Sequence, residues 1–200
     1  CQFILNVDRQ IAACYIYCQV IYKAGDDNMK TSDLIHERSI ALADCNNFFV
    51  SCERRVDNDL DSRPVVVLSS NDGCVISRSN EVKKMRVKMG DPYFKIRNML
   101  AFNGVAIRST NMSLYQEISA EIMSRIKLYT DAVEIYSIDE SFFNMGISNV
   151  KDPLSYCRMI KKDIWDKCRI PVSIGIAPTK TLSKLATEYA KKNDETGGVF

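Results

Sequence analysis

The stretch VEIYSIDESF, residues 133–142, joins two apolar runs through a pair of acids. The two runs predict neighbouring strands over 133–138 and 141–145, with Asp139 and Glu140 where the first strand ends. A similar run, IALAD at 40–44, ends in Asp44 and predicts another short strand. Acids that close apolar strands are therefore the main pattern of this sequence.

Strands and helices alternate on either side of these runs. PVVVL, SSNDG and CVIS at 64–77 have the chemistry of a hairpin, with a turn between two apolar strands. Further strands are expected at 105–107 and 172–176, and helices at 46–55, 79–85, 111–127, 152–167 and 179–192. Without residues 50–104 the order is β-α-β-β-α-β, which predicts an α/β (α+β) ferredoxin-like sandwich with a small insert.

In a sheet of this order the first and third strands lie side by side in the middle. Asp44 and the pair Asp139 and Glu140 should then meet at one edge, where three carboxylates repel one another unless a cation neutralises them. Oxygen ligands suit Mg²⁺, and two such ions support nucleotidyl transfer. The alternative is an acidic pair that simply ends a strand in solvent.

Composition excludes several other classes of protein. The chain has 200 residues, 46% of them hydrophobic, and a net charge of +2, which is too mild to indicate a nucleic-acid partner alone. Its eight cysteines form no C-x-x-C pair and His36 is the only histidine, so a zinc site is not expected. With no membrane span and no signal peptide, we expect a cytoplasmic protein with reduced thiols.

Five blocks of sequence resemble Y-family translesion DNA polymerases, and the UmuC-like subgroup in particular. These blocks stand in the family's order from residue 40 to the end, and SNDGC followed by MGDPYF is the most specific part. They are DCNNFFVSCER (44–54), VVVLSSNDGCVISRSNEVKKMRVKMGDPYFK (65–95), STNMSLYQEIS (109–119), VEIYSIDESF (133–142) and SIGIAPTKTLSKLATEYAKK (173–192).

The resemblance implies a two-Mg²⁺ site at the acids that the strand pattern had already singled out. Asp44, Asp139 and Glu140 match the family's catalytic metal ligands. The backbone carbonyl of Cys45 matches a further metal contact.

The resemblance also implies a nucleotide-binding site. Phe49 matches the steric gate, a ring that leaves no room for a ribose 2′-OH, and its neighbour Phe48 is a further candidate contact. The alternative is that both rings belong to the core. Triphosphate contacts are expected from Ser77, Asn80, Lys83 and Lys191. The segment 78–97, with seven Lys/Arg and two acids, fits a surface near phosphates.

The implied domain organisation is a catalytic palm over 40–49 and 105–200, with fingers over 50–104. Residues 1–39 have no recognised counterpart and are treated as an unassigned extension or linker. The family's thumb and little finger are expected to be absent from this chain.

The expected function is error-prone translesion synthesis in DNA repair and the SOS response. The partners implied are damaged primer-template DNA, dNTP, and in the full-length protein a UmuD-like dimer and the sliding clamp. One alternative is an inactive truncated remnant that binds DNA, dNTP or a UmuD-like partner without synthesis. The other is a nucleotide cyclase, but SIDES is a poor substitute for a GGDEF-like hairpin.

Overall fold

The structure is a computed structural model that describes residues 39–144 and 152–200. Nearly all of the expected extension over 1–39 lies outside these residues, as does the end of the strand expected to reach residue 145. Within the described ranges no helix is long and apolar enough to cross a membrane.

The larger of two sheets has four strands in the order β5-β6-β1-β7. Its strands are β1 (Ile40–Cys45), β5 (Val133–Ile135), β6 (Glu140–Asn144) and β7 (Val172–Ala177). All of its pairings are antiparallel. With α6 (Met112–Ile126) and α7 (Pro153–Cys168), the chain order is β1-α6-β5-β6-α7-β7. The predicted βαββαβ arrangement is therefore confirmed, including the adjacency of its first and third strands.

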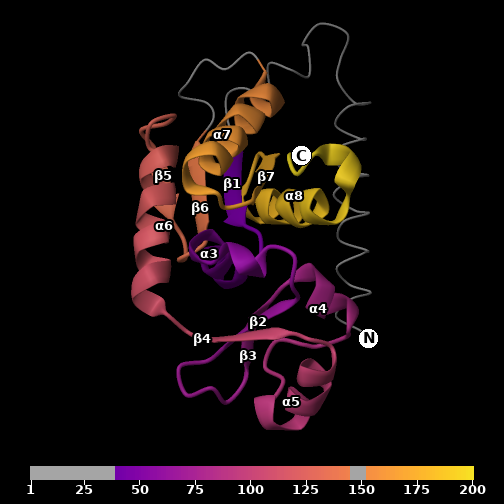
Figure 1. Cartoon of the computed structure of the whole chain (residues 1–200). Coiled ribbons are helices and arrows are strands. Elements are labelled where there is room, and N and C mark those ends of the chain that lie inside the picture. Colours follow the sequence, from indigo (N-terminus) through magenta and orange to yellow (C-terminus); the bar gives the residue numbers. More distant parts are fainter. Residues whose placement is uncertain (1–38, 145–151) are drawn as a thin grey trace, which may run out of the picture.

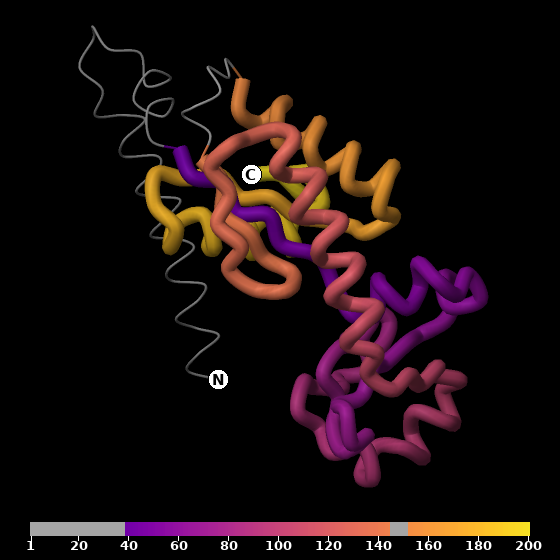
Figure 2. The backbone as a smooth tube through the Cα atoms, turned by 90° about the vertical axis from the view of Figure 1, so that its left-hand side faces the viewer, coloured from indigo at the N-terminus to yellow at the C-terminus, as the bar shows by residue number. Residues whose placement is uncertain are grey.

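Alternation along the strands decides what each face of this sheet contacts. Helices α6 and α7 cover one face (Figures 1 and 2). Ala41, Ala43 and Ile174 belong to the core on that face. Leu42 and Gly175 point to the other face, where α8 (Lys180–Lys192) lies across β1 and β7. Because side chains alternate, Asp44 is on the same face as α8.

The smaller sheet has three strands, in the order β3-β2-β4. Its strands are β2 (Val65–Leu68), β3 (Val75–Arg78) and β4 (Ala106–Ser109). β2 and β3 form the predicted hairpin, whereas β4 pairs parallel to β2. The strand expected at 105–107, at the start of the second palm segment, thus belongs to the sheet of the insert and not to the larger sheet.

Short helices accompany the smaller sheet, and it has a core of its own, with Val66, Leu68 and Leu100 at its centre. The helices are α3 (Phe48–Val56), which joins the two sheets, α4 (Asn80–Lys84), α5 (Tyr93–Phe102) and the 3-10 turn Asn58–Leu60. A second 3-10 turn, Asp194–Thr196, follows α8. The described chain is thus two lobes, each with its own sheet (Figure 2). The larger core also takes in Val65, Val67 and Ala106 of the smaller sheet.

Candidate active site between the two sheets

Strand register brings the acids to one end of the larger sheet. Asp44 on β1 and Glu140 on β6 are directly paired, so their side chains leave the same face of the sheet. Asp139 precedes this pair, and its carbonyl accepts a hydrogen bond of 3.0 Å from the Cys45 amide. The predicted meeting of these segments at one edge is confirmed.

A tight turn leads into the acidic pair. The expected strand over 133–138 ends at Ile135, because the amides of Tyr136 and Ser137 both donate to the carbonyl of Glu140. The Ser137 hydroxyl donates to Asp139 Oδ1 at 2.7 Å and accepts from the Glu140 amide at 3.1 Å. The serine of the SIDES motif therefore fixes the orientation of Asp139.

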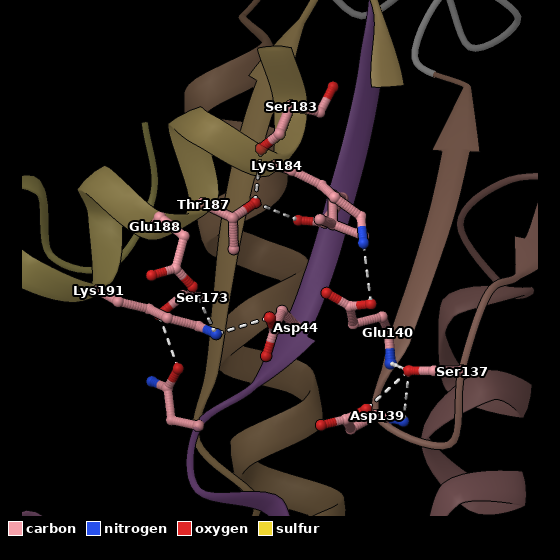
Figure 3. Close-up of polar contacts among 12 residues, drawn as sticks. Asp44, Ser137, Asp139, Glu140, Ser173, Ser183, Lys184, Thr187, Glu188 and Lys191 are labelled. Carbon is pink, nitrogen blue, oxygen red and sulfur yellow. Dashed lines mark hydrogen bonds and ion pairs between the residues drawn. The ribbon is translucent and has the colours of Figure 1, made fainter. Parts of the chain in front are cut away.

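Two lysines of α8 neutralise the acids (Figure 3). Lys191 Nζ lies 2.6 Å from Asp44 Oδ2, and Lys184 Nζ lies 3.3 Å from Glu140 Oε2. Residues seven apart on a helix share a face, so one helix supplies a cation to each acid. Lys184, which also lies over the Tyr136 ring at 4.0 Å, is a site residue that sequence reasoning missed.

Small and hydroxylated residues hold α8 close to the sheet. The hydroxyls of Ser183 and Thr187 donate to the carbonyls of Ile40 and Leu42 on β1, at 2.7 and 3.3 Å. A Cβ on Gly175 would meet the Thr187 amide nitrogen at 2.2 Å. The close approach of α8 thus requires glycine at this position of β7.

Burial raises the pKa of Asp44 to about 6, even though Lys191 lowers it, and the charges of the other two acids raise it further. Burial tends to lower the pKa of Lys191, but the attraction of Asp44 outweighs this effect and raises it. One lysine therefore does not fully compensate the buried carboxylate. Additional positive charge at this end of the sheet would be favourable.

The three carboxylates do not form a ready-made metal cluster. Within residues 39–144 and 152–200, no group of three His, Cys, Asp or Glu side chains is arranged to hold a metal ion. The expectation that the side chains of Asp44, Asp139 and Glu140 converge is wrong for this structure. Like charges repel, and each carboxylate turns to a nearer lysine or hydroxyl.

The donor set nevertheless fits a divalent metal. Asp44, Asp139, Glu140 and the Cys45 carbonyl offer only oxygen atoms, which is the chemistry that Mg²⁺ prefers. Their backbones share one strand end, and the raised pKa of Asp44 shows that its negative charge is undercompensated.

A pocket beside this strand end gathers most of the predicted residues. Of the ten site residues expected from the sequence, Glu140 and Asn80 are the two that do not line it. Glu140 is held by Lys184, and Asn80 accepts a hydrogen bond of 3.1 Å from Asn47. The lining consists of Asp44, Cys45, Asn47, Phe48, Phe49, Ile76, Ser77, Arg78, Lys83, Met89, Asp139 and Lys191.

Three cations from both lobes face this pocket. Burial lowers the pKa of Lys83, and the positive charges of Arg78 and Lys191 lower it further. Among the described residues, Arg78 is one of three whose buried polar atom, here Nε, has no hydrogen-bond partner. Arg78 was counted in the basic segment 78–97 but not chosen as a site residue. Cations that repel one another around a cavity suit an anion of high charge.

The two phenylalanines play different parts. Phe48 is buried in the core, whereas Phe49 is half-buried and stacks on Tyr115, with ring centroids 4.6 Å apart. Only one of the two rings therefore packs wholly inside, and the alternative that both belong to the core does not hold for Phe49. Phe49 also lines the pocket, together with Asp44 and Lys83.

The fold and this arrangement of acids match one class of protein. Residues 43–188 match the impB/mucB/samB family, and the chain belongs to that family. Protein UmuC of Salmonella typhimurium strain LT2 is 44% identical over 161 residues, which cover 80% of this chain and 38% of UmuC. The recognition of a UmuC-like member of the Y family is confirmed. The chain spans well under half the length of the curated relatives that it matches first.

Solved structures lead to the same class. The insertion ternary complex of Dbh DNA polymerase has a TM-score of 0.71 and 25% identity, covering 80% of this chain and 47% of that chain. DinB from Sulfolobus solfataricus has a TM-score of 0.71 and 27% identity, covering 81% of this chain and 48% of that chain. The expected fold, a ferredoxin-like palm with a small fingers insert, is thereby confirmed.

Proposed function

We propose that this chain carries the nucleotidyl-transfer site of an error-prone translesion DNA polymerase. The observation that carries the proposal is the pocket that Asp44 and Asp139 line together with three cations and Phe49. The similarity to UmuC and to Dbh DNA polymerase supports the same function. The substrates are dNTP and damaged primer-template DNA, in DNA repair and the SOS response.

Asp44, Asp139, Glu140 and the Cys45 carbonyl would hold two Mg²⁺. When bound, these ions would activate the primer 3′-OH and stabilise the leaving pyrophosphate. Lys191 and Lys184 neutralise Asp44 and Glu140 in the structure. Lys191 lines the pocket beside Asp44, so its ammonium group would also be placed to contact the triphosphate.

The remaining residues bind and orient the nucleotide. Arg78, Lys83 and Lys191 carry positive charge to the triphosphate, where charge develops during transfer. Ser77 lines the pocket. Asn80 does not line it, but it accepts a hydrogen bond from Asn47, which does.

Phe49 lies under the sugar and excludes a 2′-OH. Phe48, buried beneath it, contributes chiefly by supporting the backbone of that wall.

The proposed palm comprises 40–49 and 105–200, and the proposed fingers 50–104. β4, at the start of the second palm segment, pairs with β2 of the fingers. The palm and the fingers are therefore connected through the smaller sheet. In a full-length protein, a UmuD-like dimer and the sliding clamp are the proposed partners. We expect the chain to bind Mg²⁺ together with dNTP at the pocket described above.

Isothermal titration of dATP in Mg²⁺ tests this function. The wild-type chain should bind, and Asp139→Asn should abolish Mg²⁺-dependent binding. Asp166→Asn, which removes an exposed carboxylate of α7 paired with Lys162, is the matched control and should bind normally. Equal binding by wild type and Asp139→Asn would favour the truncated remnant.

A further inference from the structure

Tyr115 of α6 contacts the Phe49 ring and a buried acid at the same time. It is 0% exposed, its ring stacks on Phe49 at an interplanar angle of 20°, and its hydroxyl donates to Glu53 Oε1 at 2.6 Å. Burial and this hydrogen bond raise the pKa of Tyr115, so the hydroxyl stays protonated and can donate. The ring and the hydroxyl are thus each held by a different residue of α3.

Spacing along α3 makes these two contacts a single clamp. Phe49 and Glu53 are four residues apart, so they lie on one face of the helix, one turn from each other. Tyr115 crosses both, with its ring at Phe49 and its hydroxyl at Glu53. Because its ring and its hydroxyl are both held, Tyr115 offers a ring plane of fixed orientation against which the Phe49 ring packs.

Glu53 is itself anchored from the smaller sheet. It is 7% exposed, and its Oε2 lies 3.9 Å from Arg108 Nε on β4. Arg108 Nη2 also donates to Asp57 Oδ2 at 2.7 Å, at the end of α3. The clamp therefore joins α3, α6 and β4.

Apolar packing alone does not account for this arrangement. A phenylalanine at position 115 would fill the same space without a carboxylate having to be buried opposite it. Buried charged groups lose hydration and are seldom the most stable choice, although they can fix one geometry. The geometry fixed here is that of the ring that faces the pocket.

We propose that Tyr115 and Glu53 are positioning residues that hold the Phe49 ring at the pocket and so set the discrimination against ribonucleotides. The inference rests on the proposed function, in which Phe49 meets the sugar. It adds that the rejection of a 2′-OH depends on a hydrogen bond beneath the gate as well as on the gate itself.

The test uses the whole chain labelled with fluorophenylalanine and titrated with dATP or ATP in Mg²⁺. The ¹⁹F line of Phe49, assigned by its absence in Phe49→Tyr, reports the ring, and the titrations give both dissociation constants. Tyr115→Phe keeps the ring and removes the hydroxyl. Tyr156→Phe is the matched control, because it removes a hydroxyl that donates to the Tyr129 carbonyl at 2.6 Å, away from the pocket.

In Tyr115→Phe, the ratio of the ATP to the dATP dissociation constant should fall about fivefold, in keeping with one lost hydrogen bond. The Phe49 line should shift, while dATP affinity stays within about twofold because no triphosphate contact changes. Glu53→Leu should act in the same way, whereas Glu53→Gln, whose amide oxygen still accepts the hydroxyl, should restore discrimination. Tyr156→Phe should leave the ratio and the line unchanged.

Wild-type discrimination that survives in both Tyr115→Phe and Glu53→Leu would overturn the inference and leave the proposed function intact. So would an equal loss in Tyr156→Phe, which would indicate a general loss of stability. A wild-type chain that binds neither nucleotide would overturn the proposed function, and the inference with it.

Discussion

At the scale of single residues, Asp44 illustrates a conflict between stability and function. The residue is 8% exposed, and burial together with two neighbouring acids raises its pKa to about 6 despite Lys191. A hydrophobic or amide side chain would be easier to bury at this strand end. The charge is retained at a cost, as expected for a residue whose purpose is to bind a cation.

Asp44 should therefore lower the stability of the chain as the pH rises. Its pKa in the folded chain, about 6, exceeds the ordinary 3.8, so the folded chain holds the proton more tightly than the unfolded chain. The contribution of this group to stability is largest below the ordinary pKa and is lost as the pH rises through 6. Between about pH 4.5 and about pH 7.5 the loss should be about 2 kcal/mol.

The measurement is urea unfolding of wild type and Asp44→Asn in a chelator at these two pH values. The stability of the variant relative to wild type should rise by that amount at the higher pH. The comparison cancels the other titrating groups. A difference that is independent of pH would mean that Asp44 has an ordinary pKa.

At the scale of elements, α8 determines the geometry of the acids. Its Ser183 and Thr187 donate hydrogen bonds to carbonyls of β1. Gly175 on β7 has no side chain and so lets the helix approach closely. Its lysines reach Asp44 and Glu140 only because the helix lies this close.

Gly175→Ala should displace α8. The new methyl group would lie 2.2 Å from a backbone nitrogen, which cannot move as a flexible side chain can. We expect a loss of about 3 kcal/mol in unfolding free energy, together with weaker Mg²⁺-dependent dATP binding. Gly104→Ala is the control: nothing lies within 4 Å of the new methyl group, and the positive φ of +63° alone should cost about 1 kcal/mol. Equal effects of the two changes would contradict the account of α8.

Elements were predicted where local pattern decides them. The helix expected at 179–192 is found as Lys180–Lys192, and the hairpin at 64–77 is present. The strand predicted over 133–138 is too long, because the amides of Tyr136 and Ser137 donate to the Glu140 carbonyl and form a turn where the strand was expected to continue. The parallel pairing of β4 with β2 joins segments about 40 residues apart, and no local pattern carries that information.

At the scale of the whole molecule, the site exists because two lobes meet. Asp44, Asp139 and Lys191 come from the larger sheet and α8, whereas Arg78 and Lys83 come from the smaller lobe. Motif resemblance identified the acids and Phe49. It did not identify Arg78 or Lys184, because the way in which a cationic side chain points depends on how the elements pack. The orientation of the carboxylates was also beyond sequence patterns, since it depends on which lysine or hydroxyl each one meets.

Two adjacent lysines of α4, Lys83 and Lys84, allow a specific contact with the nucleotide to be distinguished from the effect of the overall positive charge. Both side chains have solvent-accessible area, but Lys83 is partly desolvated where it lines the pocket, whereas Lys84 does not line it. Lys83→Ala should weaken Mg²⁺-dependent dATP binding about tenfold, the scale of one charge-assisted hydrogen bond, whereas Lys84→Ala should change it less than about twofold. Titration calorimetry measures both. Similar losses in the two variants would indicate that only the overall positive charge of the lobe matters.

The central claim, that this strand end holds divalent cations for nucleotidyl transfer, is tested most directly by locating the metal. Crystals of the chain grown with Mn²⁺ and a non-hydrolysable dATP analogue would be measured at the manganese absorption edge. The account predicts anomalous peaks between Asp44 and Asp139, with Glu140 turned away from Lys184 toward them. Manganese bound elsewhere, with Lys191 and Lys184 still on their acids, would contradict it.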